Sequence, residues 1–259
     1  VIYDVIQNTV MHFPQLTTPD FEETTPCWSA DGKTLYYARA RTTTPLPGED
    51  FFATILRIRY DLMKVDFDEQ TLTFGEPEVV ISSEKYQNSI FQPRTNNNGR
   101  FLIYTEMPSS TFPPSQQIAN LRLLDLETNR MDSLTNINSD KVESWHSWSS
   151  ESKWFVFSSK RMDDMFGYLY FGYIDSNGNA PYKPLLLPQK SPHFYKTYLH
   201  TYNIPELIKG SFAIGVYDFI DIVNKKAKPT QHRFVGESPA YKTVLKSGGV
   251  QGSTAQENI

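Results

Sequence analysis

The sequence predicts an all-β protein built from repeated four-stranded antiparallel units, and three observations support this. A tight turn followed by a strand rich in apolar residues occurs three times along the chain. Each copy is followed by an alternating strand that ends in aspartate, and then by a shorter strand. The 17 prolines and 13 glycines favour many turns over long helices. Four strands per repeat are typical of the blades of a β-propeller.

The first turn and its strands lie in residues 26–41, which read PCWSADGKTLYYARAR. Asp31-Gly32 supplies the positive backbone φ angle that a tight hairpin turn requires. Residues 35–38 read as the strand that leaves this turn. The segment therefore predicts a β-hairpin.

Two altered copies of this hairpin follow, at residues 89–107 and 143–161. The second has an Asn-rich turn that ends in Gly99, and it reads as one residue longer than the first. The third repeats the Trp-Ser pair at Trp148-Ser149 but lacks both Asp and Gly at its turn. We take Gly32, Gly99 and Ser152 as equivalent turn positions. Their spacing exceeds the roughly 40 to 50 residues of an ordinary blade, so insertions must lie between the strands.

The second half of each unit also recurs, at residues 61–81, 120–135 and 167–187. In each, an alternating strand ends in an aspartate and a polar turn precedes a shorter final strand. These aspartates are Asp66 or Asp68, Asp125 and Asp175. The three predicted blade repeats cover about residues 26–81, 89–135 and 143–187.

The run P-x-W-S-x-D-G-K-x-L-x-Y at residues 26–37 resembles the WD-repeat-like propeller repeat of the TolB family. This repeat also occurs in the propellers of prolyl-oligopeptidase-type enzymes. Weaker copies lie at residues 91–104 and 145–157, and residues 196–210 resemble a segment of TolB-like envelope proteins of Gram-negative bacteria. The resemblance implies a TolB-like β-propeller in the periplasm or cell envelope, with other envelope proteins as its partners.

Three repeats are fewer than the four or more blades of most closed propellers. Residues 1–10 are expected to end a preceding blade, and residues 212–223 to supply strands or a short helix that closes the ring. A complete small ring and a partial or irregular ring both remain open. We expect one propeller domain over residues 1–246 and a flexible tail over residues 247–259, which is small and polar.

Composition and charge exclude several classes of protein. A net charge of −4 gives no electrostatic footprint for nucleic acid. Cys27 is the only cysteine, so the chain has no internal disulfide and no site built from several cysteines. Its place beside Trp28 predicts a buried, inert thiol. The sequence shows neither a signal peptide nor an apolar transmembrane segment, so the expected location depends on the resemblance alone.

The candidate binding residues lie in two Pro-rich loops, at residues 41–59 and 107–119. Both are expected to connect the second and third strands of their blades, and therefore to leave the fold at the same rim. Loops on a rigid scaffold commonly carry binding functions, although such loops also cap a ring or pack on a neighbouring domain. The candidate partner-binding residues are Phe51, Phe52, Phe112, Pro113 and Pro114.

No catalytic, cofactor-binding or metal-binding residue is assigned, because the chain lacks the common nucleophile, zinc, phosphate and haem motifs. His146, within Trp-His-Ser-Trp, is the candidate channel residue, with a hydrogen-bonded structural role as the alternative. The acidic pair Asp163-Asp164 is expected to be a hydrated loop pair rather than a pair of catalytic acids. Asp31 is expected to close its own turn.

These observations predict a non-catalytic, TolB-like β-propeller that acts as a protein-binding platform in the bacterial cell envelope. The first alternative is a propeller enzyme that acts on a glycan or peptide through carboxylates at its channel. The second is an accessory propeller domain of a larger multidomain protein. Because propellers host many unrelated activities, the fold alone does not choose among them.

Overall fold

The predicted repeats fold as consecutive antiparallel sheets. The structure is a computed structural model of the chain, and it describes residues 1–13, 16–110, 112–191, 193–202, 204–211, 214–225 and 230–235. The chain divides into two compact units, one formed by Asp20–Lys209 and the other by Val1–Pro19 with Gly210–Ile259. The larger unit contains all three predicted blades.

Each blade is a meander in which neighbouring strands are antiparallel. Blade 1 contains β3 (Phe21–Trp28), β4 (Thr34–Arg41), β5 (Asp61–Asp68), β6 (Thr73–Phe74) and β7 (Glu78–Ile81). Its outer strand is split, because β6 and β7 pair with different parts of β5. Blade 2 contains β8 (Ser89–Thr95), β9 (Phe101–Met107), β10 (Asn120–Asp125) and β11 (Met131–Asp132). Blade 3 contains β12 (Glu143–Trp148), β13 (Trp154–Ser159), β14 (Tyr168–Tyr173) and β15 (Leu185–Leu186).

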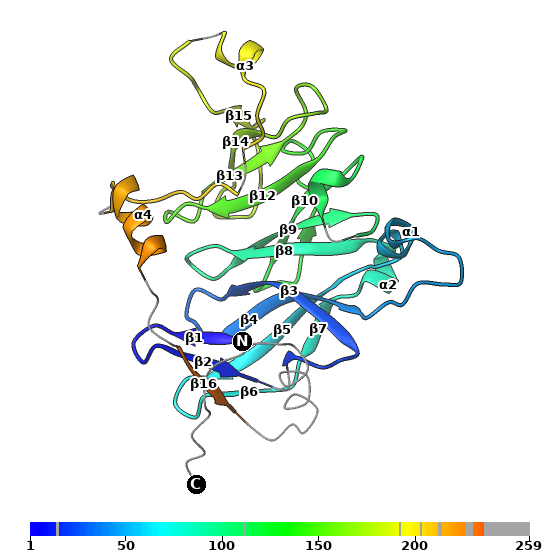
Figure 1. Cartoon of the computed structure of the whole chain (residues 1–259). Helices are drawn as coiled ribbons and strands as arrows, with labels where there is room; N and C mark the ends of the chain where they lie inside the picture. Colours follow the sequence, from blue (N-terminus) through cyan, green and yellow to red (C-terminus); the bar gives the residue numbers. More distant parts are fainter. Residues whose placement is uncertain are drawn as a thin grey trace. The chain divides into compact units, whose positions relative to one another are not determined.

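Short helices lie in the connections between these strands and after the last of them, β15. They are α1 (Phe51–Leu56), α2 (Ser83–Tyr86), the 3₁₀ helix η2 (Pro113–Ser115) and α3 (Phe194–Thr197). Figure 1 shows the three sheets of the larger unit stacked in chain order, and the first strands β3, β8 and β12 contact one another in that order. This arrangement confirms the predicted β-propeller architecture of four-stranded antiparallel blades, in a partial ring.

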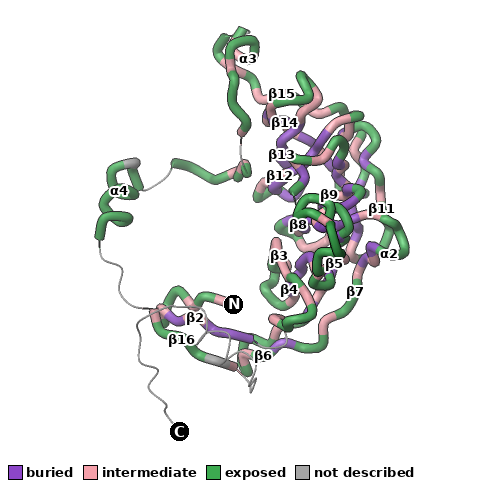
Figure 2. Tube along the Cα trace, turned by 45° about the vertical axis from the view of Figure 1, so that its right-hand side comes forward, coloured by how far each residue is buried: buried purple, intermediate pink, exposed green. Residues whose placement is uncertain are grey.

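Apolar side chains hold the blades face to face. Between blades 1 and 2 the buried core includes Tyr36, Leu62, Ile90, Leu102 and Tyr104. Between blades 2 and 3 a larger, aromatic core includes the following buried side chains: Phe101, Ile103, Leu121, Trp148, Phe155, Phe157 and Tyr170. The buried positions in Figure 2 accordingly follow the strands of the sheets. Burial of apolar area on this scale is the main favourable term in folding.

A β-bulge recurs at the same place in the first strand of every blade. In blade 1 the register passes from Thr24↔Ala38 to Cys27↔Tyr36, so one extra residue lies on β3. The same shift occurs in β8 and in β12. A residue with positive φ lies inside each bulge, namely Thr25, Gln92 and Trp145. A bulge bends its strand and increases the local twist.

The first hairpin turn of each blade also has one common geometry. In blade 1 the backbone N–H of Gly32 donates to the Ser29 carbonyl, and in blades 2 and 3 the same bond joins Gly99 to Asn96 and Ser152 to Ser149. Gly32, Gly99 and Ser152 all have positive φ, which confirms their equivalence. The predicted extra residue in the second turn is wrong, because the second turn is as long as the first.

An aspartate at the end of the third strand, or two residues after it in blade 3, caps the following turn in each blade. The side chains of Asp68 and Asp125 each accept hydrogen bonds from the backbone N–H groups two and three residues later. The side chain of Asp175 accepts them from the N–H groups two and four residues later. Hydrogen bonding of this kind lowers the pKa of a carboxyl group, and the pKa of Asp68 and of Asp175 is accordingly lowered. Asp68, rather than Asp66, is therefore the capping residue in blade 1.

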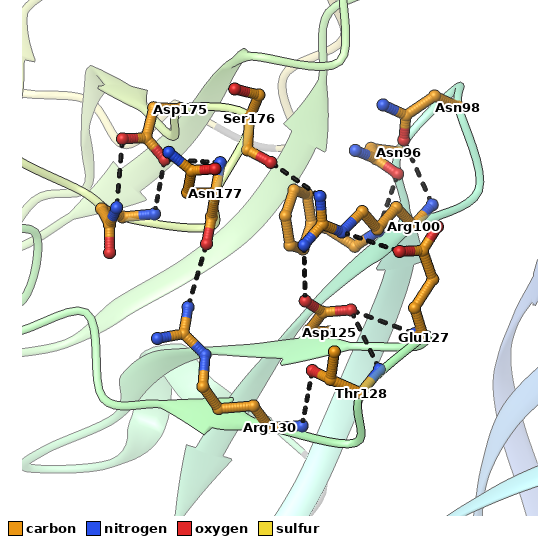
Figure 3. Close-up of polar contacts among 12 residues, drawn as sticks. Asn96, Asn98, Arg100, Asp125, Glu127, Thr128, Arg130, Asp175, Ser176 and Asn177 are labelled. Atoms are coloured by element: carbon orange, nitrogen blue, oxygen red, sulfur yellow. Dashed lines mark hydrogen bonds and ion pairs between the residues drawn. The ribbon is translucent and has the colours of Figure 1, made fainter.

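Two arginines of blade 2 reach the corresponding turn of blade 3 (Figure 3). Arg100 Nη1 donates to the Ser176 carbonyl at 2.8 Å, while its Nη2 donates to Asp125 Oδ2 at 3.0 Å. Arg130 Nη2 donates to the Asn177 carbonyl at 3.1 Å. The bonds to Ser176 and Asn177 join blade 2 to the outer turn of blade 3, in addition to the apolar core.

The smaller unit contains a three-stranded sheet and a helix. Strand β1 (Ile2–Asp4) is antiparallel to β2 (Thr9–His12), and β16 (Gln231–Phe234) is parallel to β2. Helix α4 (Val216–Asn224) lies in the segment where strands or a short helix were expected, whereas β16 was not expected. Residues 212 and 213 and the predicted tail at residues 247–259 lie outside the described residues. No helix among the described residues is long and apolar enough to cross a membrane.

Candidate functional site

The two loops chosen from the sequence lie next to each other. Residues 42–60 join β4 to β5, and residues 108–119 join β9 to β10, so both connect second and third strands as expected. Arg59 Nε donates to the Pro108 carbonyl at 3.1 Å, and the Ser110 N–H donates to the Ile58 carbonyl at 2.9 Å. The two loops therefore form one surface.

The equivalent loop of blade 3, residues 160–167, contacts the second loop. Lys160 Nζ donates to the Pro114 carbonyl at 2.7 Å. The Phe112 ring packs edge-on against Trp145 of β12, with 5.8 Å between the ring centroids. All three blades thus contribute to this end of the larger unit, which we call the loop rim.

Charged and polar contacts hold the first loop in place. Asp50 caps α1, because its Oδ1 accepts the Ala53 N–H at 2.8 Å. Glu49 accepts two hydrogen bonds from the Arg57 guanidinium, each 2.7 Å long, and these bonds lower the pKa of Glu49 to about 2. The helix that carries Phe51 and Phe52 is therefore fixed at its start and at its end.

The five predicted binding residues divide into two groups. Phe51, Phe52 and Phe112 are exposed, with 70%, 76% and 50% of their surface accessible. Pro113 is buried and Pro114 is half-buried, and both belong to η2, which shapes the second loop. The phenylalanines are thus available to a partner, while the prolines support the loop that presents Phe112.

Further exposed apolar side chains lie on the same three loops, and sequence reasoning missed them. We define the apolar rim as the exposed large apolar residues of the loop rim: Leu46, Phe51, Phe52, Leu56, Phe112, Ile118, Met162 and Met165. Met162 and Met165 have no local signal for exposure, because methionine also commonly fills protein cores. Large exposed apolar side chains on adjacent, hydrogen-bonded loops favour an interaction site, because apolar residues that gather on a surface commonly mark one.

The acidic pair in the third loop is occupied by local contacts. Asp163 Oδ1 accepts the N–H groups of Met165 and Phe166, both at 2.9 Å, and its Oδ2 accepts the Tyr168 hydroxyl at 2.7 Å. Asp164 forms an ion pair with Lys141 at 3.0 Å. The two carboxylates therefore hold the loop that carries Met162 and Met165.

His146 of β12 is buried between blades 2 and 3. Its Nε2 donates to the Ile103 carbonyl at 3.0 Å. Burial lowers the pKa of His146 to about 3, so the imidazole is neutral at physiological pH. This environment gives the side chain a structural hydrogen bond between adjacent blades.

The remaining candidates also have local partners. Asp31 Oδ1 accepts the Lys33 N–H at 3.1 Å and the Ser29 hydroxyl at 2.6 Å, as expected for a residue that closes its own turn. The prediction that Cys27 is buried is wrong, because its side chain is partly exposed. Within the described ranges, no three His, Cys, Asp or Glu side chains are grouped as a metal site would require.

Comparison with known proteins finds likeness in three-dimensional structure only. No family model matches the chain, and no curated protein matches it in sequence. A TolB candidate from Agrobacterium tumefaciens is 14% identical, with 65% of this chain and 50% of that chain covered and a TM-score of 0.42. TolB from Acinetobacter baumannii is 19% identical, with 68% and 34% covered and a TM-score of 0.39.

An oligogalacturonate lyase, solved in complex with manganese, is 13% identical, with 67% of this chain and 44% of that chain covered and a TM-score of 0.47. The chain thus spans half or less of the length of these three solved structures. The chain is similar to parts of TolB proteins and of a propeller lyase, and its own sheets define it as a β-propeller of at least three blades.

Proposed function

We propose that this protein is a non-catalytic, TolB-like β-propeller that binds a partner protein of the bacterial cell envelope through its apolar rim. The observation that carries the proposal is the exposure of Phe51, Phe52 and Phe112 on loops that hydrogen bonds hold in place. Burying such rings against a partner would release water from apolar surface, which favours association.

The fixed geometry of the loops supports binding rather than a capping role. Ordering a flexible loop on binding costs conformational entropy, and a loop that is already ordered avoids much of that cost. The bonds from Arg57 to Glu49, from Arg59 to Pro108 and from Lys160 to Pro114 provide this order. Aromatic residues that are exposed and held in this way are common anchors of protein interfaces.

The rival proposal of a propeller enzyme would require several acids that converge on one cleft. Of the acids weighed for this role, Asp31 and Asp163 instead accept hydrogen bonds within their own turn or loop. Asp164 forms an ion pair with Lys141. The binding proposal therefore has the more specific support.

The test is affinity capture with the tagged protein from a cross-linked envelope fraction of its native host, followed by mass spectrometry. The rim variant is the double substitution Phe51→Ser and Phe52→Ser, which changes exposed residues and should leave the fold intact. The matched control is the double substitution Leu185→Ser and Leu199→Ser, which removes exposed apolar side chains outside the rim.

We expect the wild type and the control to capture the same partner and the rim variant to lose it. The purified partner should then bind the rim variant at least about tenfold more weakly, as expected for the loss of central aromatic anchors. Equal binding by the rim variant and the control would overturn the assignment of the apolar rim as the binding surface.

A further inference from the structure

A second candidate site lies at the other end of the blades and is separate from the proposed function. It is a pocket of about 300 Å³ where the first strands of all three blades end. Because adjacent strands are antiparallel, this end lies opposite the loops that join second to third strands. The residues that line it include Cys27, Trp28, Arg94, Asn97, Ser147 and Glu206.

Arg94 gives the pocket a positive charge with unused hydrogen-bond donors. Its side chain is 39% exposed, and among the described residues its ion pair is with Glu206, with 3.8 Å between Nη2 and Oε1. This separation is too long for a hydrogen bond. Within the described part of the chain, the guanidinium group of Arg94 has no other side-chain hydrogen bond or ion pair.

Ser147, behind the pocket surface, carries a buried polar group whose bonding is incomplete among the described residues. The residue is 3% exposed, and its hydroxyl has no hydrogen-bond partner among the described residues. Buried polar groups in folded proteins are usually paired, and an unpaired one needs an explanation. Because this oxygen is buried, a ligand in the pocket would contact Arg94 directly and would reach the Ser147 hydroxyl only after a shift of the pocket wall.

The remaining walls favour a small ligand with an apolar part. The Trp28 indole, which packs against Phe67 and Phe74, offers a flat apolar surface, and the exposed Asn97 offers an amide. A pocket of this volume is at the lower end of the range for small-molecule sites. It therefore suits a compact ligand or the end of a peptide rather than a long chain.

We propose that this pocket binds a carboxylate, with Arg94 as its cationic partner, and that Glu206 takes the place of that carboxylate in the free protein. Glu206 is an internal carboxylate already directed to the same guanidinium. Its ion pair is long and exposed, so it should be weak. A ligand carboxylate could instead form the paired, charge-assisted hydrogen bonds that arginine makes most strongly.

The single cysteine makes the site testable, because Cys27 lines the pocket and no other thiol competes for a reagent. The rate of Cys27 modification by a thiol reagent would be measured at increasing concentrations of each probe. Glutarate represents a free carboxylate, and N-acetyl-Gly-Gly-Ala represents a peptide carboxylate. The amidated form of that peptide and inorganic phosphate are the comparison probes.

We expect glutarate or the free-acid peptide to protect Cys27, with a dissociation constant of about 1 mM or less, and the amidated peptide to give no protection. The more protective of the two shows whether the carboxylate is free or peptide-borne.

Arg94→Gln should weaken binding at least about tenfold. Glu206→Gln should strengthen it about threefold or more, because the internal competitor is removed. Lys33→Gln, an exposed charge near the same end of blade 1, should change binding less than about twofold.

Failure of both carboxylates to protect Cys27 in the wild type would overturn the proposal. Equal protection by phosphate would also overturn it, since the pocket would then be a general anion site. If Arg94→Gln perturbs folding, Glu206→Gln still tests the proposal, because Glu206 is exposed and its replacement should leave the fold intact. Weaker carboxylate binding by Glu206→Gln would contradict the proposed competition between Glu206 and the ligand for Arg94. None of these results depends on the apolar rim.

Discussion

The side-chain Oε1 of Gln92 accepts a hydrogen bond from the backbone N–H of Trp145 at 3.1 Å. Each residue lies in the bulge of its own blade. The bulges of blades 1 and 2 make an equivalent contact, in which Thr25 Oγ1 accepts the Gln92 N–H at 3.3 Å. The bulges thus join each first strand to the first strand of the next blade through hydrogen bonds outside the ladders of the individual sheets.

Replacing Gln92 with Ala should therefore destabilise the larger unit. The substitution removes the acceptor for Trp145 and leaves an N–H group without its partner, which costs about 1–3 kcal/mol. The free energy of unfolding would be measured by urea denaturation. Gln87→Ala is the matched control, because Gln87 also has positive φ but is exposed, and it should change stability by about 0.5 kcal/mol or less. Equal effects of the two substitutions would contradict the role assigned to the bulge contact.

The sequence predicted the strands well because their signals are local. Turn chemistry at Asp31-Gly32 and the aspartates that end the third strands mark element boundaries without reference to distant residues. The third turn was also identified correctly, although Ser152 replaces glycine there. In that position the Ser152 side chain joins blade 3 to blade 2, since its Oγ accepts a hydrogen bond from the Asn98 N–H at 3.0 Å.

The contacts between blades could not be predicted in the same way. The bulges had a local signal, because Pro26 and Pro93 lie inside strands, where proline is confined to edges and bulges. The partners of the bulge residues, however, depend on how the sheets stack. The apolar rim was found only in part for the same reason, since the loop of blade 3 joins it through the Lys160–Pro114 contact. The parallel pairing of β16 with β2 connects the two ends of the chain and has no local pattern.

Replacing Gly99 with Ala should cost about 1–2 kcal/mol, because an L-residue with a side chain is strained at positive φ. The φ angle of Gly99 is 79°, and its missing Cβ would meet only Ala30 Cβ at 3.8 Å, so the cost comes from the backbone. Gly75→Ala is the control, since Gly75 does not have positive φ and has similar space. Thermal unfolding of both variants would check this, and a loss in Gly75→Ala as large as in Gly99→Ala would contradict it.

The free energy of unfolding should depend on pH through protonation of the Glu23 carboxyl group on β3. Burial raises the pKa of Glu23 to about 7, against the opposing charge of Arg39. The folded state therefore holds this proton more tightly than the unfolded chain, and the free energy of unfolding falls as the pH rises from about 4.5 through 7. Because the side chain is partly exposed, we expect a loss of only about 1 kcal/mol.

Glu23→Gln removes the titrating group and should be more stable than the wild type at pH 8 by about this amount, with little difference at pH 4.5. Urea unfolding of both proteins at the two pH values isolates the contribution of Glu23, because every other titrating group is common to them. A constant difference across this range would show that Glu23 titrates near its ordinary pKa.

The two tryptophans of the Trp-Ser pairs should differ in their contribution to stability, although the sequence presents them alike. Trp148 is buried, packs against Phe155 with 5.5 Å between ring centroids, and donates from Nε1 to the Arg94 carbonyl at 3.0 Å. Trp28 is 36% exposed and packs on Phe67 and Phe74. Trp148→Ala should therefore cost about 3–5 kcal/mol, and Trp28→Ala about 1–2 kcal/mol, because less apolar surface is uncovered. Urea unfolding would measure both, and a larger loss for Trp28→Ala would mean that blade 1, rather than the joint between blades 2 and 3, limits the stability of the larger unit.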